Sequence, residues 1–519
     1  MFRRTIPFAL LLASSLVFAS IARAQIPAAK PAPLTKVPSS DQTCAAGRPC
    51  AEVAPVMLSS AQGASALEEN LRHLTDVIGG RVSGTPAAHR AATWTAEAFR
   101  RAGADTVSIE KFTMPVSWAE GHTRATILAP EPFPVRLVAN AWTPPTPKGG
   151  IEADIVDAGD GDDAGFAKAG AAARGAIALV HSKPLETWED LLGEYSRGPG
   201  VVERAKKAGA RAVFWMSSRP SLLLYRHTLT VDGRLEKLPQ ATVAREDAER
   251  IARFLAAGEK VRVRFDAPNQ AGGPVESENV IAEIRGYDKP EEFVLLGAHL
   301  DSWELGTGAL DNGCNAALVI EAARVVKSSG TVPRRSIRFA LFTGEEEGLL
   351  GSAAYAHAHR AELDGMVAAV VFDSGIGRVT GYSLGGRKDT LAAVRELLEP
   401  LASLGVANDT LDAGMDTDNF DFLLEGVPTL VANQEPANYM LNYHAASDTF
   451  DKVDFAELKR STGIAAVTAY ALANAENRIG RRQSRAEIER LLEETGLEAD
   501  MRATGFWPYW EKSERGRQK

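Results

Sequence analysis

The feature that most constrains the fold is the alternation, between residues 279 and 477, of short apolar runs with stretches of helical spacing. Near-continuous apolar runs are typical of strands that are buried on both faces of a sheet. Helical stretches such as 316–328 and 389–404 separate the runs, as expected where helices cover both faces. The sequence therefore predicts an α/β fold with strands at 279–284, 293–300, 336–342, 367–372 and 428–432.

The chain of 519 residues is long enough for several parts, each with its own core. Helical spacing in 64–78 and 87–102, followed by a strand-like stretch at 106–112, predicts an N-terminal portion of the main domain. Short β-type runs, glycine-rich turns and two helices then predict an inserted accessory domain. The predicted boundaries are a signal peptide at 1–24, a flexible leader at 25–55, the N-terminal portion at 56–125, the insert at 126–270, the main domain at 271–480 and a helical tail at 481–519.

The N-terminus has the pattern of a targeting segment. Arg3 and Arg4 precede a mostly apolar stretch at 6–20, and small residues flank Arg23 at a cleavage-type site. The apolar run has about 15 residues, which is shorter than the roughly 20 that cross a bilayer. We expect cleavage after Ala24 and a secreted or periplasmic protein without a membrane span.

The charge and the cysteine content of the chain limit which partners it binds and which disulfide bonds it forms. The formal net charge is −9, and an acidic chain without a basic stripe argues against a nucleic-acid partner. Cys44 and Cys50 lie in a loose segment of an exported chain, so they form either a local disulfide or two unpaired thiols. Cys314 is predicted to be a buried, inert thiol. The aromatic run 507–510 packs on its own domain or forms a homodimer contact.

Side chains that commonly bind metal ions follow several of the predicted strands. His299 and Asp301 end one strand, and the two-residue period of a strand places both side chains on one face. Open α/β sheets place their sites at such strand ends. Each acid alone also fits a helix cap or a surface charge, but together they indicate a metal site. The other candidates are Asp311, Glu345, Glu346, Asp373 and His444.

Two histidines and three carboxylates suit two zinc ions that share one carboxylate. Two metals about 3.5–4 Å apart activate a water and hold the carbonyl that it attacks. An imidazole ligand also needs its second ring nitrogen fixed, and Asp301 is placed to do this. A general base must take the proton of the water, and Glu345 is the candidate because it adjoins Glu346.

Four segments resemble the co-catalytic zinc aminopeptidase and carboxypeptidase family of the MH clan. They are GAHLDSWELGTGALDNG, RFALFTGEEEGLLGSAAYA, VVFDSG and NYHAASDTFDKVD. The run from His299 to Trp303 is most similar to the carboxypeptidase Q (plasma glutamate carboxypeptidase) branch. The resemblance extends from about residue 60 to 477, and 175–180 with 205–213 is similar to a protease-associated domain. It implies a three-layer αβα sandwich around a mixed sheet, with an inserted protease-associated β-rich domain.

The resemblance also implies how two zinc ions are held. His299, Asp311 and Asp373 would hold one ion. Asp311, Glu346 and His444 would hold the other, so that Asp311 bridges the pair.

Five further residues receive roles from the resemblance. Glu345 takes the position of the base, and Asp301 orients the first histidine ligand. Tyr443 stabilises the oxyanion or simply packs, and Asp416 lies in a loosely matching stretch near the substrate. Trp303 lines the pocket or belongs to the core.

The implied activity is that of a secreted zinc exopeptidase acting on a peptide or dipeptide, as an aminopeptidase or as a dipeptidase or carboxypeptidase. The first rival is a glutaminyl cyclase, whose relatives resemble one-zinc proteins without the first histidine ligand, whereas this chain has His299. The second is a non-catalytic receptor or binding module, but such relatives lose ligands and every ligand position is filled here. The sequence assigns no arginine to a substrate carboxylate.

Overall fold

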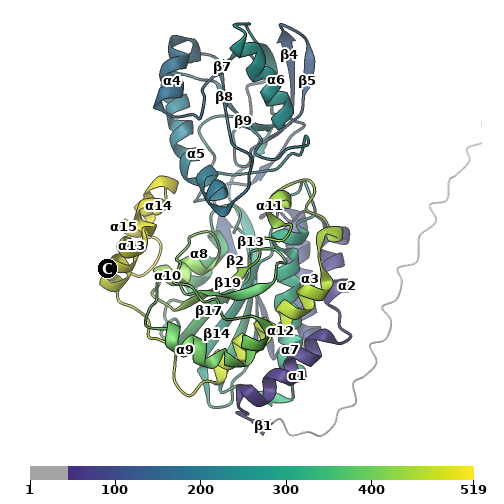
Figure 1. Cartoon of the computed structure of the whole chain (residues 1–519), viewed down its shortest axis with the longest axis vertical. Helices are drawn as coiled ribbons and strands as arrows, with labels where there is room; N and C mark the ends of the chain where they lie inside the picture. Colours follow the sequence, from purple (N-terminus) through teal and green to yellow (C-terminus); the bar gives the residue numbers. More distant parts are fainter. Residues whose placement is uncertain (1–44) are drawn as a thin grey trace, which may run out of the picture. The chain divides into compact units, whose positions relative to one another are not determined.

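The computed structural model describes residues 45–519 (Figure 1). Its main sheet has seven strands in the order β18-β19-β17-β14-β16-β13-β2. The four strands β19, β17, β14 and β16 are parallel, and β18, β13 and β2 pair antiparallel at the edges, so the predicted mixed sheet is confirmed. The strands are β2 (Thr106–Met114), β13 (Val275–Ile284), β14 (Lys289–His299), β16 (Arg335–Phe342), β17 (Met366–Val371), β18 (Val379–Ser383) and β19 (Thr429–Gln434).

Helices cover both faces of this sheet because successive strand residues point to opposite sides. Val280 and Ala282 belong to one core and Ile281 to the other. The first core is shared with α1 (Cys50–Gln62), α2 (Leu67–Arg72), α3 (Pro86–Ala102), α7 (Cys314–Ser328), α9 (Leu391–Leu397) and α12 (Phe455–Asn474). The second is shared with α8 (Leu350–Ala358) and α10 (Asn419–Leu424). The result is three layers, helix, sheet and helix (Figure 1).

A second sheet forms between Arg124 and Asp266, in the region predicted as an insert, with the strand order β5-β4-β11-β7-β8-β9-β10-β6. Its strands are β4 (Arg124–Ala129), β5 (Phe133–Val135), β6 (Leu137–Ala139), β7 (Ile151–Asp157), β8 (Ile177–Val180), β9 (Ala212–Met216), β10 (Gln240–Val243) and β11 (Arg262–Asp266). Its helices are α4 (Asp163–Ala169), α5 (Trp188–Ala208) and α6 (Arg245–Ala256). The sequence predicted two helices here, since α4, with 7 residues, is too short to show a clear period. Its classification as a protease-associated domain stays a prediction.

The predicted leader extends too far. Helix α1 begins at Cys50, so residues 50–55 are helical although Pro55 lies inside the helix. The helix forms because Val53, Met57 and Ala61 bury one face in the core, which outweighs the hydrogen bond that proline cannot make. The predicted signal peptide, most of the leader and Cys44 lie outside the described residues, so the pairing of Cys44 with Cys50 stays a prediction.

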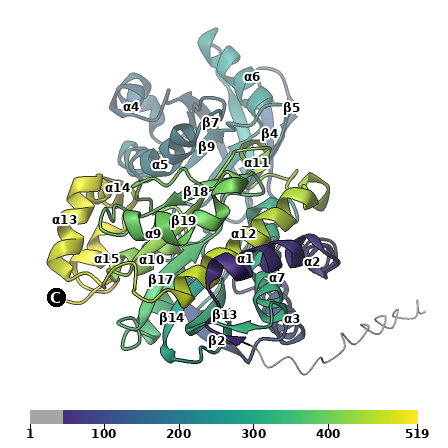
Figure 2. The same cartoon turned by 60° about the horizontal axis from the view of Figure 1, so that its bottom comes forward.

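The C-terminal tail contains three short helices instead of the single one predicted. They are α13 (Arg485–Thr495), α14 (Leu497–Thr504) and α15 (Trp507–Glu511). Gly496 and Gly505 separate them at φ values of 82° and 98°, which glycine adopts without strain. The tail packs on α10, and Trp510 is 1% exposed, so this part of the aromatic run packs within the chain (Figure 2). Between residues 45 and 519, no helix is both long and apolar enough to cross a membrane.

Candidate metal centre

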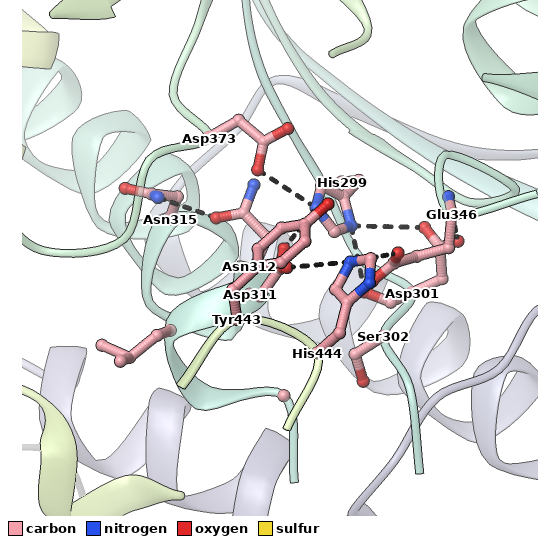
Figure 3. Close-up of polar contacts among 12 residues, drawn as sticks. His299, Asp301, Ser302, Asp311, Asn312, Asn315, Glu346, Asp373, Tyr443 and His444 are labelled. Atoms are coloured by element: carbon pink, nitrogen blue, oxygen red, sulfur yellow. Dashed lines mark hydrogen bonds and ion pairs between the residues drawn. The ribbon is translucent and has the colours of Figure 1, made fainter. Parts of the chain in front are cut away.

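The first group of ligand-type side chains forms where parallel strands end. His299 is the last residue of β14, and Asp373 follows β17 by two residues. The Nε2 atom of His299 lies 3.1 Å from Asp311 Oδ1 and 3.1 Å from Asp373 Oδ1 (Figure 3). Since β14 and β17 are parallel neighbours, their carboxyl ends bring these side chains together.

The second group shares Asp311 with the first. His444 Nε2 lies 3.3 Å from Asp311 Oδ2 and 2.8 Å from Glu346 Oε2. Within each group, the candidate ligand atoms all lie within 4.8 Å of one another. Asp311 Oδ2 and Glu346 Oε1 are buried and have no hydrogen-bond partner in the described part of the chain. A set of nitrogen and oxygen donors of this kind fits zinc.

The charges of the cluster also favour cations. Burial lowers the pKa of His444, but the carboxylates of Glu346 and Asp311 outweigh that effect and raise this pKa to about 9. Burial raises the pKa of Glu346 to about 7. A buried group of carboxylates is costly without positive charge nearby, so a bound cation would stabilise it.

Asp448 fixes the backbone that carries Asp311. Its carboxylate accepts hydrogen bonds from the backbone N–H groups of Ala309 (3.1 Å), Leu310 (2.7 Å) and Asp311 (3.1 Å). Asp311 has non-helical backbone angles just before α7, so the regular hydrogen bonds of a helix do not fix its position. The sequence predicts no role for Asp448, although this residue lies four positions after His444 in the segment that carries the resemblance.

Asp301 lies beside His299, as expected, and it also contacts a neighbouring loop. The nearest partner of His299 Nδ1 is the backbone oxygen of Asp301 at 3.0 Å, while the carboxylate Oδ1 is 3.5 Å away. Asp301 Oδ2 instead accepts hydrogen bonds from Ser83 Oγ (3.0 Å) and from the backbone N–H groups of Gly344 (3.0 Å) and Glu346 (3.3 Å). Asp301 therefore contacts His299 through its backbone oxygen and Oδ1, while Oδ2 holds the loop that carries Glu346.

Arg81 is a second residue that sequence reasoning missed. Its guanidinium is fully buried, and within the described part of the chain it donates only to backbone oxygens. These hydrogen bonds hold the loop after β14 in place. The acceptors are Leu300 (2.7 Å), Leu74 (3.3 Å), Gly79 (3.0 Å), Thr307 (2.9 Å) and Gly308 (2.8 Å). No motif marks this arginine, because its partners come from separate loops.

A cavity of about 450 Å³ opens onto both ligand groups. Glu345 lines it and is partly exposed, whereas Glu346 is 8% and Glu347 is 0% exposed. Burial raises the pKa of Glu345 well above its usual range. Asp416 also lines the cavity, so the structure brings this residue to the same space.

Tyr443 lines the cavity too and connects it with the second sheet. Its ring stacks on His444 with centroids 3.7 Å apart, and its hydroxyl oxygen lies 2.5 Å from that of Tyr195 in α5. The backbone N–H of Arg226 donates to the carbonyl of His444 at 3.0 Å. Residues of the predicted insert therefore contact both a candidate ligand and its neighbour.

Trp303 lies behind the ligands and does not line the large cavity. Its side chain is 3% exposed and belongs to a core cluster with Trp142. The Trp303 ring centroid lies 6.0 Å from that of His444 and 6.3 Å from that of Trp142. The structure therefore favours the core alternative for Trp303 over a substrate contact.

Comparisons with known proteins agree with this geometry. The family model described as peptidase family M28 matches residues 279–469. Mouse (Mus musculus) carboxypeptidase Q is 30% identical over 416 residues, covering 80% of this chain and 87% of that protein. Aminopeptidase YwaD of Bacillus subtilis (strain 168) is 31% identical over 291 residues, covering 55% and 56%. The crystal structure of a peptidase M28 precursor from Shewanella amazonensis SB2B has a TM-score of 0.76 at 28% identity, covering 84% of this chain and 99% of that one.

Proposed function

Because the chain belongs to peptidase family M28 and is a zinc metallopeptidase, we propose that it is an exported two-zinc aminopeptidase that removes the N-terminal residue of peptides. The observation that carries the proposal is the pair of ligand groups that share Asp311 and face one cavity with Glu345. His299 and Asp373 would complete one zinc site, and Glu346 and His444 the other. When bound, such ions supply Lewis acidity and lower the pKa of a water.

Glu345 supplies the proton transfers in this proposal. Its carboxylate accepts a proton from the attacking water and then donates it to the leaving amine, as a general base and then a general acid. Burial raises the pKa of Glu345, which makes its carboxylate a stronger base for the proton of the water. The Tyr443 hydroxyl lines the same cavity and would donate a hydrogen bond to the oxyanion.

The charges that line the cavity favour a free α-amine over a terminal carboxylate. No lysine or arginine among the described residues lines it, whereas Glu189, Asp416 and Asp500 do, in addition to the ligand carboxylates. A substrate carboxylate needs a cationic partner, usually arginine. These carboxylates provide acceptors for an ammonium group. The proposed cleavage therefore removes residues from the N-terminus of the substrate peptide.

Mass spectrometry of products tests the proposal. The substrates are a free dipeptide, a longer free peptide and the N-acetylated form of that peptide, each with zinc and with chelator. We expect zinc-dependent loss of N-terminal residues from the unblocked peptide alone. Cleavage confined to the dipeptide would make the protein a dipeptidase, and C-terminal trimming of the acetylated peptide would make it a carboxypeptidase. No hydrolysis in the presence of zinc would exclude all three.

Export is part of the same proposal. Residues 1–24 have the charged, apolar and small-residue regions of a signal peptide, in that order. Expression of the full chain in a bacterium should place the protein outside the cytoplasm with Gln25 as its first residue, as read by N-terminal sequencing. Retention in the cytoplasm with residues 1–24 still attached would contradict it.

A further inference from the structure

Arg515, in the segment after α15, reaches the loop that carries the proposed base. Its side chain is 8% exposed and forms a two-pronged ion pair with Asp421 of α10, with N–O distances of 2.6 Å and 2.7 Å. The same guanidinium donates to the carbonyl of Gly348 at 2.9 Å and to that of Leu349 at 3.0 Å. These two residues follow directly after Glu345, Glu346 and Glu347.

The carbonyls of Gly348 and Leu349 belong to a turn that is stabilised by contacts with other parts of the chain. The N–H groups of Gly348 and Leu349 donate to the carbonyl of Glu345 at 3.0 Å and 2.9 Å. The peptide unit between Gly348 and Leu349 is therefore held at both ends, by Glu345 and by Arg515. Leu349 has φ of 60°, a left-handed conformation that costs free energy in a residue with a side chain. Such a conformation persists only where the surroundings hold it.

We propose that Arg515 is a positioning residue for catalysis, which holds the Glu345 carboxylate in line with the metal centre through the Gly348–Leu349 peptide. This inference rests on the proposed function, because it takes Glu345 as the base. Arg515 lies outside residues 279–469, the range that the family model matches. The tail thus supplies part of the active-site framework, in addition to the cavity wall formed by Leu497 and Phe506.

The test removes the guanidinium without leaving a buried charge. The double variant Arg515→Met with Asp421→Asn keeps the apolar stem and an acceptor for Ser352, whose hydroxyl donates to Asp421 at 2.9 Å. Because small displacements of a catalytic group cost rate and not binding, we expect kcat to fall about tenfold or more, with KM changed less than about twofold. Zinc content should equal that of the wild type, as measured by elemental analysis.

A second buried arginine provides the matched control. Arg387 is 3% exposed, forms a two-pronged pair with Asp389 (2.8 Å and 2.7 Å) and donates to the carbonyls of Gly426 (3.3 Å) and Arg481 (3.0 Å). It has no hydrogen bond to the Glu345 loop among the described residues. The variant Arg387→Met with Asp389→Asn also removes a buried guanidinium, but it should keep kcat within about twofold, since it leaves the catalytic geometry intact.

Three outcomes would overturn the role of Arg515. They are an unchanged kcat in the Arg515 double variant, an equal loss of kcat in the Arg387 control, or a loss confined to KM. If the double variant does not fold, Arg515→Lys is assayed instead, and wild-type kcat in that variant overturns the proposal. Glu345→Gln is assayed in parallel. Activity retained in Glu345→Gln refutes Glu345 as the base, whereas its loss beside an active Arg515 double variant refutes only the positioning role. The proposed function itself fails if the wild-type protein with zinc removes no N-terminal residue.

Discussion

Three consecutive glutamates, Glu345 to Glu347, occupy three different environments within one turn. Glu345 faces the cavity, Glu346 lies 2.8 Å from His444 Nε2, and Glu347 is fully buried. Identical side chains therefore have different surroundings, because a turn points successive residues in different directions. The assignment of the base depends on this difference in exposure.

Glu345→Gln should retain zinc but lose at least about a hundredfold in kcat, because glutamine cannot accept the proton of the water. Activity and zinc content measured on the same sample separate loss of the base from loss of the metal. The control is Glu276→Gln, which changes an exposed carboxylate paired with Lys111 and should be neutral. Near-normal turnover in Glu345→Gln would contradict the assignment.

Asp448→Asn should weaken zinc binding. The amide replaces one acceptor oxygen with a donor, so at least one of the three N–H groups of the Asp311 segment loses its partner. Residues that orient a ligand typically contribute about ten- to a hundredfold to metal affinity, and competition with a chelator would measure this loss. Asp451→Asn, an exposed change nearby, should leave zinc affinity unaltered. Equal affinities in the two variants would refute the role of Asp448.

At the scale of elements, helix α5 connects the second sheet with the metal centre. Trp188, Leu192 and Tyr195 in its N-terminal half line the cavity, while its C-terminal half packs in the core of the second sheet through Val201 and Ala205. One helix therefore belongs to two environments. This arrangement makes the second sheet part of the wall around the substrate.

Tyr195→Phe should lower kcat about three- to tenfold, the size expected when one hydrogen bond is lost. In this variant the Tyr443 hydroxyl loses its hydrogen-bond partner, the Tyr195 hydroxyl, whose oxygen lies 2.5 Å from its own. Steady-state kinetics with zinc content checks this. Tyr382→Phe is the matched control, because it removes a buried hydroxyl pair with Thr468 (2.8 Å) inside the core. Unchanged kcat in Tyr195→Phe would show that the pair is structural only.

At the scale of the whole molecule, the proposed ions would connect segments that are far apart along the chain. The candidate ligand His299 ends β14, and Asp311, Glu346, Asp373 and His444 follow β14, β16, β17 and β19, respectively. Without a cation, buried carboxylates from these segments repel one another in a medium of low polarity. Bound metal ions would therefore stabilise the main domain as well as take part in its chemistry.

Removal of zinc should lower the melting temperature. A ligand that binds only the folded state stabilises it by about 4 kcal/mol when its concentration is a thousand times Kd. Scanning calorimetry of the chelated protein should show Tm rising with added zinc, and magnesium at equal concentration should have little effect because it prefers a shell of six oxygens. A Tm independent of zinc would contradict a site built from these five residues.

Local patterns in the sequence predicted six of the seven strands of the main sheet, some of its helices and the five candidate ligands, but not β18. Apolar runs and their spacing report which residues are buried, and strand ends report where polar side chains gather. Such signals arise between neighbours in the chain, so one sequence is enough to show them. The error at Pro55 arose where packing in the core outweighed a local rule.

Only the tertiary structure decided which residues hold the site in place. Arg81, Asp448 and Arg515 act through backbone groups of distant loops, and the two hydroxyls of Tyr195 and Tyr443 meet across 248 positions of the chain. A hydrogen bond to a backbone carbonyl or N–H does not require a particular residue type as the partner, because nearly every residue type offers those groups. Contacts of this kind therefore become visible only when the chain is folded.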